Sequence, residues 1–163
     1  MDTPKEISTQ IEDTKKNNGQ CKTEKWERGK GGMKAEKDIE RQGIDGLIYR
    51  VIGCMIEVHK QLGPGFLEKV YRRAITIEFE RQGIQFEAEK EIKLQYKGKS
   101  IGTHRLDLFV DNQLVIELKT VEELHKKHYA QVRSYLKAIH QPVGLLVNFA
   151  EFQLNARCVE LSP

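Results

Sequence analysis

The stretch that decides the fold is residues 105–119, which read Arg105-Leu106-Asp107-Leu108-Phe109-Val110-Asp111-Asn112-Gln113-Leu114-Val115-Ile116-Glu117-Leu118-Lys119. Two strongly apolar runs flank a short polar turn at 111–113, a pattern typical of a β-hairpin. If the loop is these three residues, Asp107 lies opposite Glu117, and directly opposed residues have Cβ atoms about 5 Å apart on one face. Lys119 is two residues beyond Glu117 and shares its face. The sequence therefore predicts three charged side chains crowded together in an apolar setting.

The predicted cluster of Asp107, Glu117 and Lys119 favours a divalent-metal site. Partly buried charges are costly unless they are paired or hold a metal. Two adjacent carboxylates repel and raise one pKa, and a cation removes that conflict. Hard oxygen ligands suit Mg²⁺ or Mn²⁺, while Lys119 could steady a water or help to neutralise a phosphate. The alternative is a metal-free buried salt bridge with Lys119 between the carboxylates. Residue types alone balance the two interpretations, and the surplus negative charge tilts modestly toward a metal.

The hairpin belongs to a predicted α-α-β-β-β-α-β order with a possible last strand. Helical periodicity runs from Ile44 to the Leu62-Gly63-Pro64-Gly65 stop, and strands alternate after Gly83. The expected helices are 44–62, 66–81 and 122–139, and the expected strands are 86–96, 101–110, 114–119, 143–147 and 152–160. The first three strands form an antiparallel meander. We expect one α/β domain with a mixed sheet of four or five strands flanked by helices.

Composition separates this domain from the N-terminal segment. The chain has 163 residues, 31% charged and 39% hydrophobic, with a net charge of +3, which suits one domain plus a tail. Residues 1–43 hold ten Lys or Arg and nine Asp or Glu with few apolar residues. Such a segment cannot bury enough surface to offset its ordering entropy. We expect a disordered tail at 1–43 and a domain at 44–163. A binding arm around Lys22–Lys34 is the alternative.

Other patterns limit the function classes. Cys21, Cys54 and Cys158 lie far apart without a CxxC pair, which favours neither a zinc ribbon nor a disulfide framework, and a cytoplasmic location is expected. We expect no membrane association, because the longest apolar segment is too short and too polar to span a bilayer. His125 and His128 have a spacing that zinc could use, but the lysines between them indicate a solvated face.

Two motifs resemble a known nuclease superfamily. Asp107 followed ten residues later by Glu117-Leu118-Lys119 resembles the D…(D/E)xK signature of the PD-(D/E)XK, or restriction-endonuclease-like, superfamily, with Leu106 in place of the usual proline. The stretch Gly65-Phe66-Leu67-Glu68-Lys69-Val70-Tyr71 resembles the motif of the GxxExxY protein family, which is assigned to that superfamily. The resemblance runs from about Ile44 to about Phe149.

The resemblance implies a role for each matching residue. Asp107 and Glu117 would be metal ligands, with the Leu118 carbonyl as a possible third, and Lys119 would be the catalytic lysine. Glu68 would complete the metal site directly or through water, and would so belong to both the metal-binding and the catalytic set. The alternative for Glu68 is a solvated carboxylate stabilised at a helix N-terminus.

A further motif lies on the helix that follows the meander. Gln131 and Tyr135 resemble the QxxxY motif of the RecB-like branch, and they share a helix face. They would contact substrate or orient Lys119. The equally weighted alternative is a helix face that packs on the sheet with its polar tips satisfied locally.

The expected function is metal-dependent hydrolysis of nucleic acid, with DNA favoured over RNA. A metal-bound water would attack phosphorus while the cation stabilises the developing charge. The main alternative is a catalytically silent scaffold of the same fold that binds nucleic acid or protein. Hydrolysis of another phosphoester is a third, less favoured interpretation. With no separate sequence-reading domain, a protein partner or a homodimer is the expected source of specificity.

Overall fold

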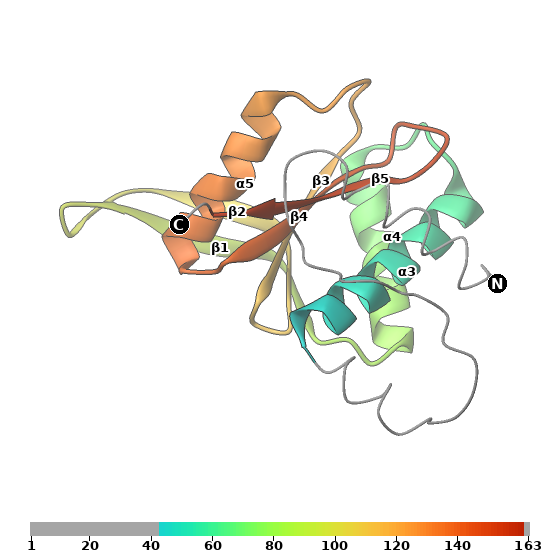
Figure 1. Ribbon diagram of the computed structural model, residues 1–163, viewed down its shortest axis with the longest axis horizontal. Coiled ribbons are helices and arrows are strands. Elements are labelled where there is room, and N and C mark those ends of the chain that lie inside the picture. The colour runs from blue at the N-terminus through green and yellow to red at the C-terminus, as the bar shows by residue number, and fades with distance from the viewer. Residues whose placement is uncertain (1–42, 162–163) are drawn as a thin grey trace, which may run out of the picture.

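A mixed β-sheet carries helices on both faces in the computed structural model, which describes residues 43–161 (Figure 1). In chain order the elements are α3 (Ile44–Leu62), α4 (Glu68–Arg81), β1 (Phe86–Tyr96), β2 (Lys99–Val110), β3 (Leu114–Lys119), α5 (Lys126–Ile139), β4 (Val143–Asn148) and β5 (Asn155–Glu160). This order confirms the predicted α/β class. The predicted tail lies, apart from Gly43, outside the described residues.

The sheet has the strand order β1-β2-β3-β4-β5. Strands β1, β2 and β3 form the predicted antiparallel meander, and β3 pairs in parallel with β4 across the α5 crossover. Pairing of Val110 with Leu114 confirms the three-residue turn. A parallel pair brings the carboxyl ends of both strands to one edge, so Lys119 lies beside Asn148.

Two hydrophobic cores lie on opposite faces of the sheet. One core joins α3 and α4 to the face that carries Leu114, Ile116 and Leu118. The other lies beneath α5 and includes Val115 and Val132. Alternation along β3 therefore directs Glu117 and Lys119 toward the α5 side of the sheet.

Strand β2 changes faces within its length. Leu106 and Phe109 both pack in the core beneath α5, whereas Leu108 and Val110 pack beneath α3 and α4. Strict alternation would place Leu106 with Leu108. On the neighbouring strand, Glu89 has a φ of 53° between two residues that pair with Leu108 and Leu106. The change of face therefore centres on Asp107.

The third helix begins later than expected. A start at Glu122 was wrong, because α5 begins at Lys126. The side-chain amide of Asn148 accepts a hydrogen bond from the backbone N–H of Val121 at 3.1 Å and donates one to its carbonyl at 2.7 Å. These bonds hold the connection outside the helical hydrogen-bonding pattern.

The remaining boundaries shift by a few residues. Helix α4 begins at Glu68 rather than Phe66, because the Phe66 N–H bonds to a tyrosine hydroxyl instead of entering a helix. Strand β2 begins at Lys99 rather than Ile101, because Lys97 and Gly98, both with positive φ, complete a two-residue turn. Strand β5 begins at Asn155 rather than Phe152, where residues 151–153 bend.

None of the helices within residues 43–161 combines the length and the apolar character needed to cross a bilayer.

Candidate active site

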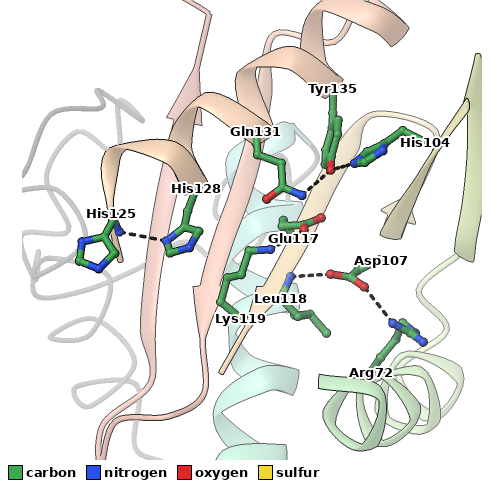
Figure 2. Close-up of polar contacts among 10 residues, drawn as sticks. All are labelled: Arg72, His104, Asp107, Glu117, Leu118, Lys119, His125, His128, Gln131 and Tyr135. Carbon is green, nitrogen blue, oxygen red and sulfur yellow. Dashed lines mark hydrogen bonds and ion pairs between the residues drawn. The ribbon is translucent and has the colours of Figure 1, made fainter. Parts of the chain in front are cut away.

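The carboxylate of Asp107 links β2 to two neighbouring elements. Its Oδ2 accepts a hydrogen bond from the backbone N–H of Leu118 at 2.8 Å, and its Oδ1 lies 2.8 Å from Nη1 of Arg72 on α4 (Figure 2). The pairing of β2 with β3 ends at Leu108 and Ile116, one residue short of Asp107 and Glu117, so the expected placement of these two residues opposite each other stays a prediction. At the change of face in β2, the carboxylate of Asp107 bonds to Arg72 of α4 and to the β3 backbone.

Glu117 is a buried carboxylate with one oxygen unsatisfied. Its Oε1 accepts a hydrogen bond from Nζ of Lys119 at 2.9 Å. Its Oε2 is buried and has no hydrogen-bond partner among residues 43–161. Burial, the charge of Asp107 and, to a smaller degree, the charge of Glu68 raise the pKa of Glu117 to about 7, against the opposing effect of Lys119. Within residues 43–161, no donor therefore offsets the negative charge on Oε2.

The hydroxyl of Tyr71 holds the turn that precedes Glu68. It donates a hydrogen bond to the carbonyl of Gly63 at 2.6 Å and accepts one from the N–H of Phe66 at 3.2 Å. The ring is fully buried and stacks on Phe149 with centroids 4.4 Å apart. The spacing of glutamate and tyrosine in this motif thus has a structural reason: the tyrosine, one turn along α4, fixes the loop from which the glutamate emerges.

Sequence reasoning missed Arg72, the partner of Asp107. Its guanidinium also lies 3.1 Å from Oε1 of Glu89, so it bridges carboxylates on two strands. A signal was present, because Arg72 lies four residues after Glu68 and residues at that spacing share a helix face. This spacing would have predicted that Arg72 contacts the same charged cluster as Glu68.

Gln131 and Tyr135 of α5 contact each other above Glu117 (Figure 2). The side-chain amide of Gln131 donates to the Tyr135 hydroxyl, which also contacts Nε2 of His104 on β2. Burial raises the pKa of Tyr135 to about 12, the Gln131 hydrogen bond opposes this, and the charges of Glu117 and Asp107 add to it. Tyr135 therefore stays a neutral hydroxyl at physiological pH. Sequence reasoning missed His104, because strict alternation does not predict the face on which it lies.

His128 borders the site from the first turn of α5. Its Nδ1 accepts a hydrogen bond from the backbone N–H of His125 at 2.9 Å. Burial and the nearby charge of Lys119 lower the pKa of His128, so its ring is neutral and caps the His125 N–H at the start of α5. Across residues 43–161, no three His, Cys, Asp or Glu side chains are arranged to hold a metal ion. The zinc alternative at His125 and His128 gains no support from this geometry.

The end of β3 is locked in place by the end of β4. The N–H of Phe149 donates to the carbonyl of Lys119 at 2.9 Å. Asn148, fully buried, bonds both backbone groups of Val121. Sequence reasoning predicted a strand at 143–147 and no role for Asn148, so it missed the residue that positions the backbone after Lys119.

The donor set fits a hard divalent cation in part. The unpartnered Oε2 of Glu117 is an anionic oxygen suited to such an ion. The charges of Asp107 and Glu68 also act on Glu117. Both oxygens of Asp107 are already bonded, however, one of them to Arg72. Each of these oxygens keeps a second lone pair for a cation, while the positive charge of Arg72 would oppose its binding.

Glu117 should make stability depend on pH. Its pKa rises from 4.5 to about 7 on folding, so the protonated form favours the folded state. The stabilisation is complete below about pH 4.5 and is lost as the pH rises through about 7, by up to about 3 kcal/mol. Urea unfolding at about pH 5 and about pH 8 should show this loss in the wild type and not in Glu117→Gln. Identical pH profiles for the two proteins would contradict the assignment.

A family model described as the PD-(D/E)XK nuclease superfamily matches residues 45–160. The chain belongs to this superfamily. The match covers every described helix and strand except the first residue of α3. Membership of the PD-(D/E)XK superfamily indicates a nuclease, typically a metal-dependent one acting on nucleic acid.

One solved structure shows a weaker likeness. It is described as "Crystal structure of SSO0001" and shares 19% sequence identity, with a TM-score of 0.48, over 59% of this chain and 51% of that chain. This chain therefore spans about half of that protein, and the likeness carries no argument about substrate. No curated protein matches the sequence.

Proposed function

We propose that this protein hydrolyses phosphodiester bonds of nucleic acid, DNA in preference to RNA, with Mg²⁺ or Mn²⁺ held by Asp107, Glu117 and Glu68. The observation that carries the proposal is the buried Glu117 carboxylate, which has one oxygen unpartnered and lies beside Asp107 and Lys119. Superfamily membership supports a nuclease over other phosphoester hydrolases.

The bound cation would supply an activated water and charge stabilisation at the phosphate. Lys119 is largely buried and held by Glu117, which fixes its ammonium group at the end of β3. If a cation occupied the carboxylate of Glu117, that ammonium group could donate a hydrogen bond to the attacking water or to a phosphate oxygen. Gln131 and Tyr135 lie above Glu117 as uncharged groups that would contact the substrate or orient Lys119.

The guanidinium of Arg72 would oppose a cation at Asp107, because its Nη1 lies 2.8 Å from Oδ1. The Leu118 backbone N–H would keep the carboxylate in place through Oδ2. Arg72 keeps its second partner, Glu89, at 3.1 Å. Glu89, which is half-exposed, would still pair with the guanidinium if Arg72 left Asp107.

A catalytically silent scaffold is the second candidate. The specific observation in its favour is that Arg72 and the Leu118 N–H satisfy Asp107 while Lys119 satisfies Oε1 of Glu117, as in a metal-free ion-pair network. The orphaned Oε2 weighs against it, because an uncompensated buried carboxylate oxygen is destabilising.

We propose further assignments of family, domain bounds, location and partner. The motif at Gly65–Tyr71, with its tyrosine buried beneath the turn, supports placement in the GxxExxY family. We also propose a domain at 44–163, a cytoplasmic location, and a protein partner or homodimer as the source of specificity.

Calorimetry of metal binding tests the proposal. We expect the wild type to bind Mn²⁺ and Mg²⁺ and to cleave DNA only when metal is present. Asp107→Asn should lose at least about tenfold in metal affinity, as loss of a charged ligand costs more than about 1.4 kcal/mol. Asp111→Asn, which removes an exposed aspartate from the hairpin turn, is the matched control and should match the wild type. A wild type that binds no metal at millimolar concentration, with or without nucleic acid, would establish the silent scaffold instead.

A further inference from the structure

The β1–β2 hairpin extends well beyond the rest of the sheet (Figure 1). Strand β2 pairs with β1 down to Lys99 but with β3 only over Leu108–Val110. The distal residues, 93–103, are here called the arm. They project from the sheet as the long hairpin drawn in green and yellow at the left of Figure 1.

The arm differs in charge from the base of the same hairpin. Residues 93–103 contain three lysines, Lys93, Lys97 and Lys99, and no aspartate or glutamate, and all three lysines are exposed. Residues 86–92 contain three glutamates. Positive charge is thus concentrated at the projecting end of the hairpin. The net charge of +3 for the whole chain does not reveal this local basic patch.

The arm also presents two large apolar side chains to solvent. Tyr96 is 62% exposed and Ile101 is 66% exposed. Ile101 is the extra residue of a β-bulge, because Leu94 pairs with Gly102 while Gln95 pairs with Ser100. Bulges re-aim side chains and recur next to functional sites. Nζ of Lys97 lies 5.5 Å from the centroid of the Tyr96 ring, so charge and aromatic surface occupy one tip.

The arm and the proposed active site belong to the same strand. Ile101 lies six positions before Asp107 along β2, which corresponds to about 20 Å at 3.3 Å per residue. Duplex DNA rises about 3.4 Å per base pair. A duplex lying along the hairpin over the site would therefore meet the arm about six base pairs from the bond to be cut.

We propose that the arm binds the flank of a duplex DNA substrate, with Lys97 and Lys99 on the phosphate backbone and Ile101 in the minor groove. This inference rests on the proposed nuclease function. Lysines at a projecting tip suit phosphates, which fix the register of a protein on the duplex. An exposed apolar side chain flanked by cations has the chemistry of the wedges that minor-groove binders use.

The test compares Lys97→Gln/Lys99→Gln with Arg73→Gln/Arg81→Gln, which removes two exposed cations from α4. Binding to duplex DNA is measured by fluorescence anisotropy across a salt series, in full-length protein carrying Lys119→Met to prevent cleavage. We expect the arm variant to reduce the salt slope by about 2, one for each phosphate contact, and the α4 variant to leave it unchanged. Ile101→Ser should weaken binding severalfold without altering the slope.

A second measurement tests the reach of the arm. A long duplex should bind more tightly than one too short to extend about six base pairs past the site, and the arm variant should lose this preference. The arm lies outside both cores, so its variants should keep the wild-type urea midpoint.

The outcomes separate the two proposals. If the wild type cleaves and binds DNA but the arm and α4 variants share one salt slope and one length preference, the arm proposal alone is overturned. If the wild type neither binds nor cleaves nucleic acid, the nuclease function fails first and the arm proposal fails with it.

Discussion

Lys119→Met is expected to lower the rate of metal-dependent DNA cleavage by at least about 10²–10³-fold, the usual cost of removing one charge-stabilising donor from an active site. Its ammonium group is fixed 2.9 Å from Oε1 of Glu117 and is largely buried, so the substitution removes a positioned donor from the site. Single-turnover cleavage of a labelled duplex measures the loss. Calorimetry should show that divalent-metal affinity is retained, because the substitution removes a positive charge beside the carboxylates.

The matched control is Lys137→Met, an exposed lysine on α5 that should cleave at the wild-type rate. The double variant Glu117→Gln/Lys119→Met guards against misfolding, because it leaves no unpaired buried charge and should keep a cooperative unfolding transition. If Lys119→Met folds, binds metal and cleaves within tenfold of the wild type, the lysine has no part in the chemistry.

Replacement of Phe149 by alanine is expected to reduce the free energy of unfolding by about 3–5 kcal/mol. The ring is fully buried just after β4, stacks on Tyr71 at 4.4 Å and lies 5.9 Å from the His59 ring. Urea titration followed by circular dichroism measures the change. Because Tyr71 holds the turn before Glu68, metal affinity should fall as well.

Phe152→Ala is the control for this loss, because Phe152 is 93% exposed and its removal should change stability by less than about 0.5 kcal/mol. Equal effects of the two substitutions would show that the stack of Phe149 on Tyr71 does not support the fold.

The hairpin and its register were predictable because local rules determine them. A three-residue turn between two apolar runs fixes the pairing of Val110 with Leu114, and Glu117 and Lys119 then share a face. The crossover helix and the buried strand β4 were predictable from periodicity and length. The interpretation of the charged cluster as a metal site stays a prediction.

Contacts between distant elements were beyond prediction. The pairing of Arg72 with Asp107 depends on how α4 packs on the sheet, and the pairing of Asn148 with Val121 depends on the parallel register of β3 and β4. His104 reaches Tyr135 only because β2 departs from alternation at Asp107, next to a glutamate in the left-handed region. No rule of local sequence specifies that departure.

The change of face in β2 also bears on how the protein unfolds. Leu106 and Phe109 belong to one core while Leu108 and Val110 belong to the other. Loss of either core would pull β2 out of register and expose apolar residues of the opposite one. The two halves therefore share a single cooperative transition, in which Asp107, at the crossing point, loses its order together with both cores.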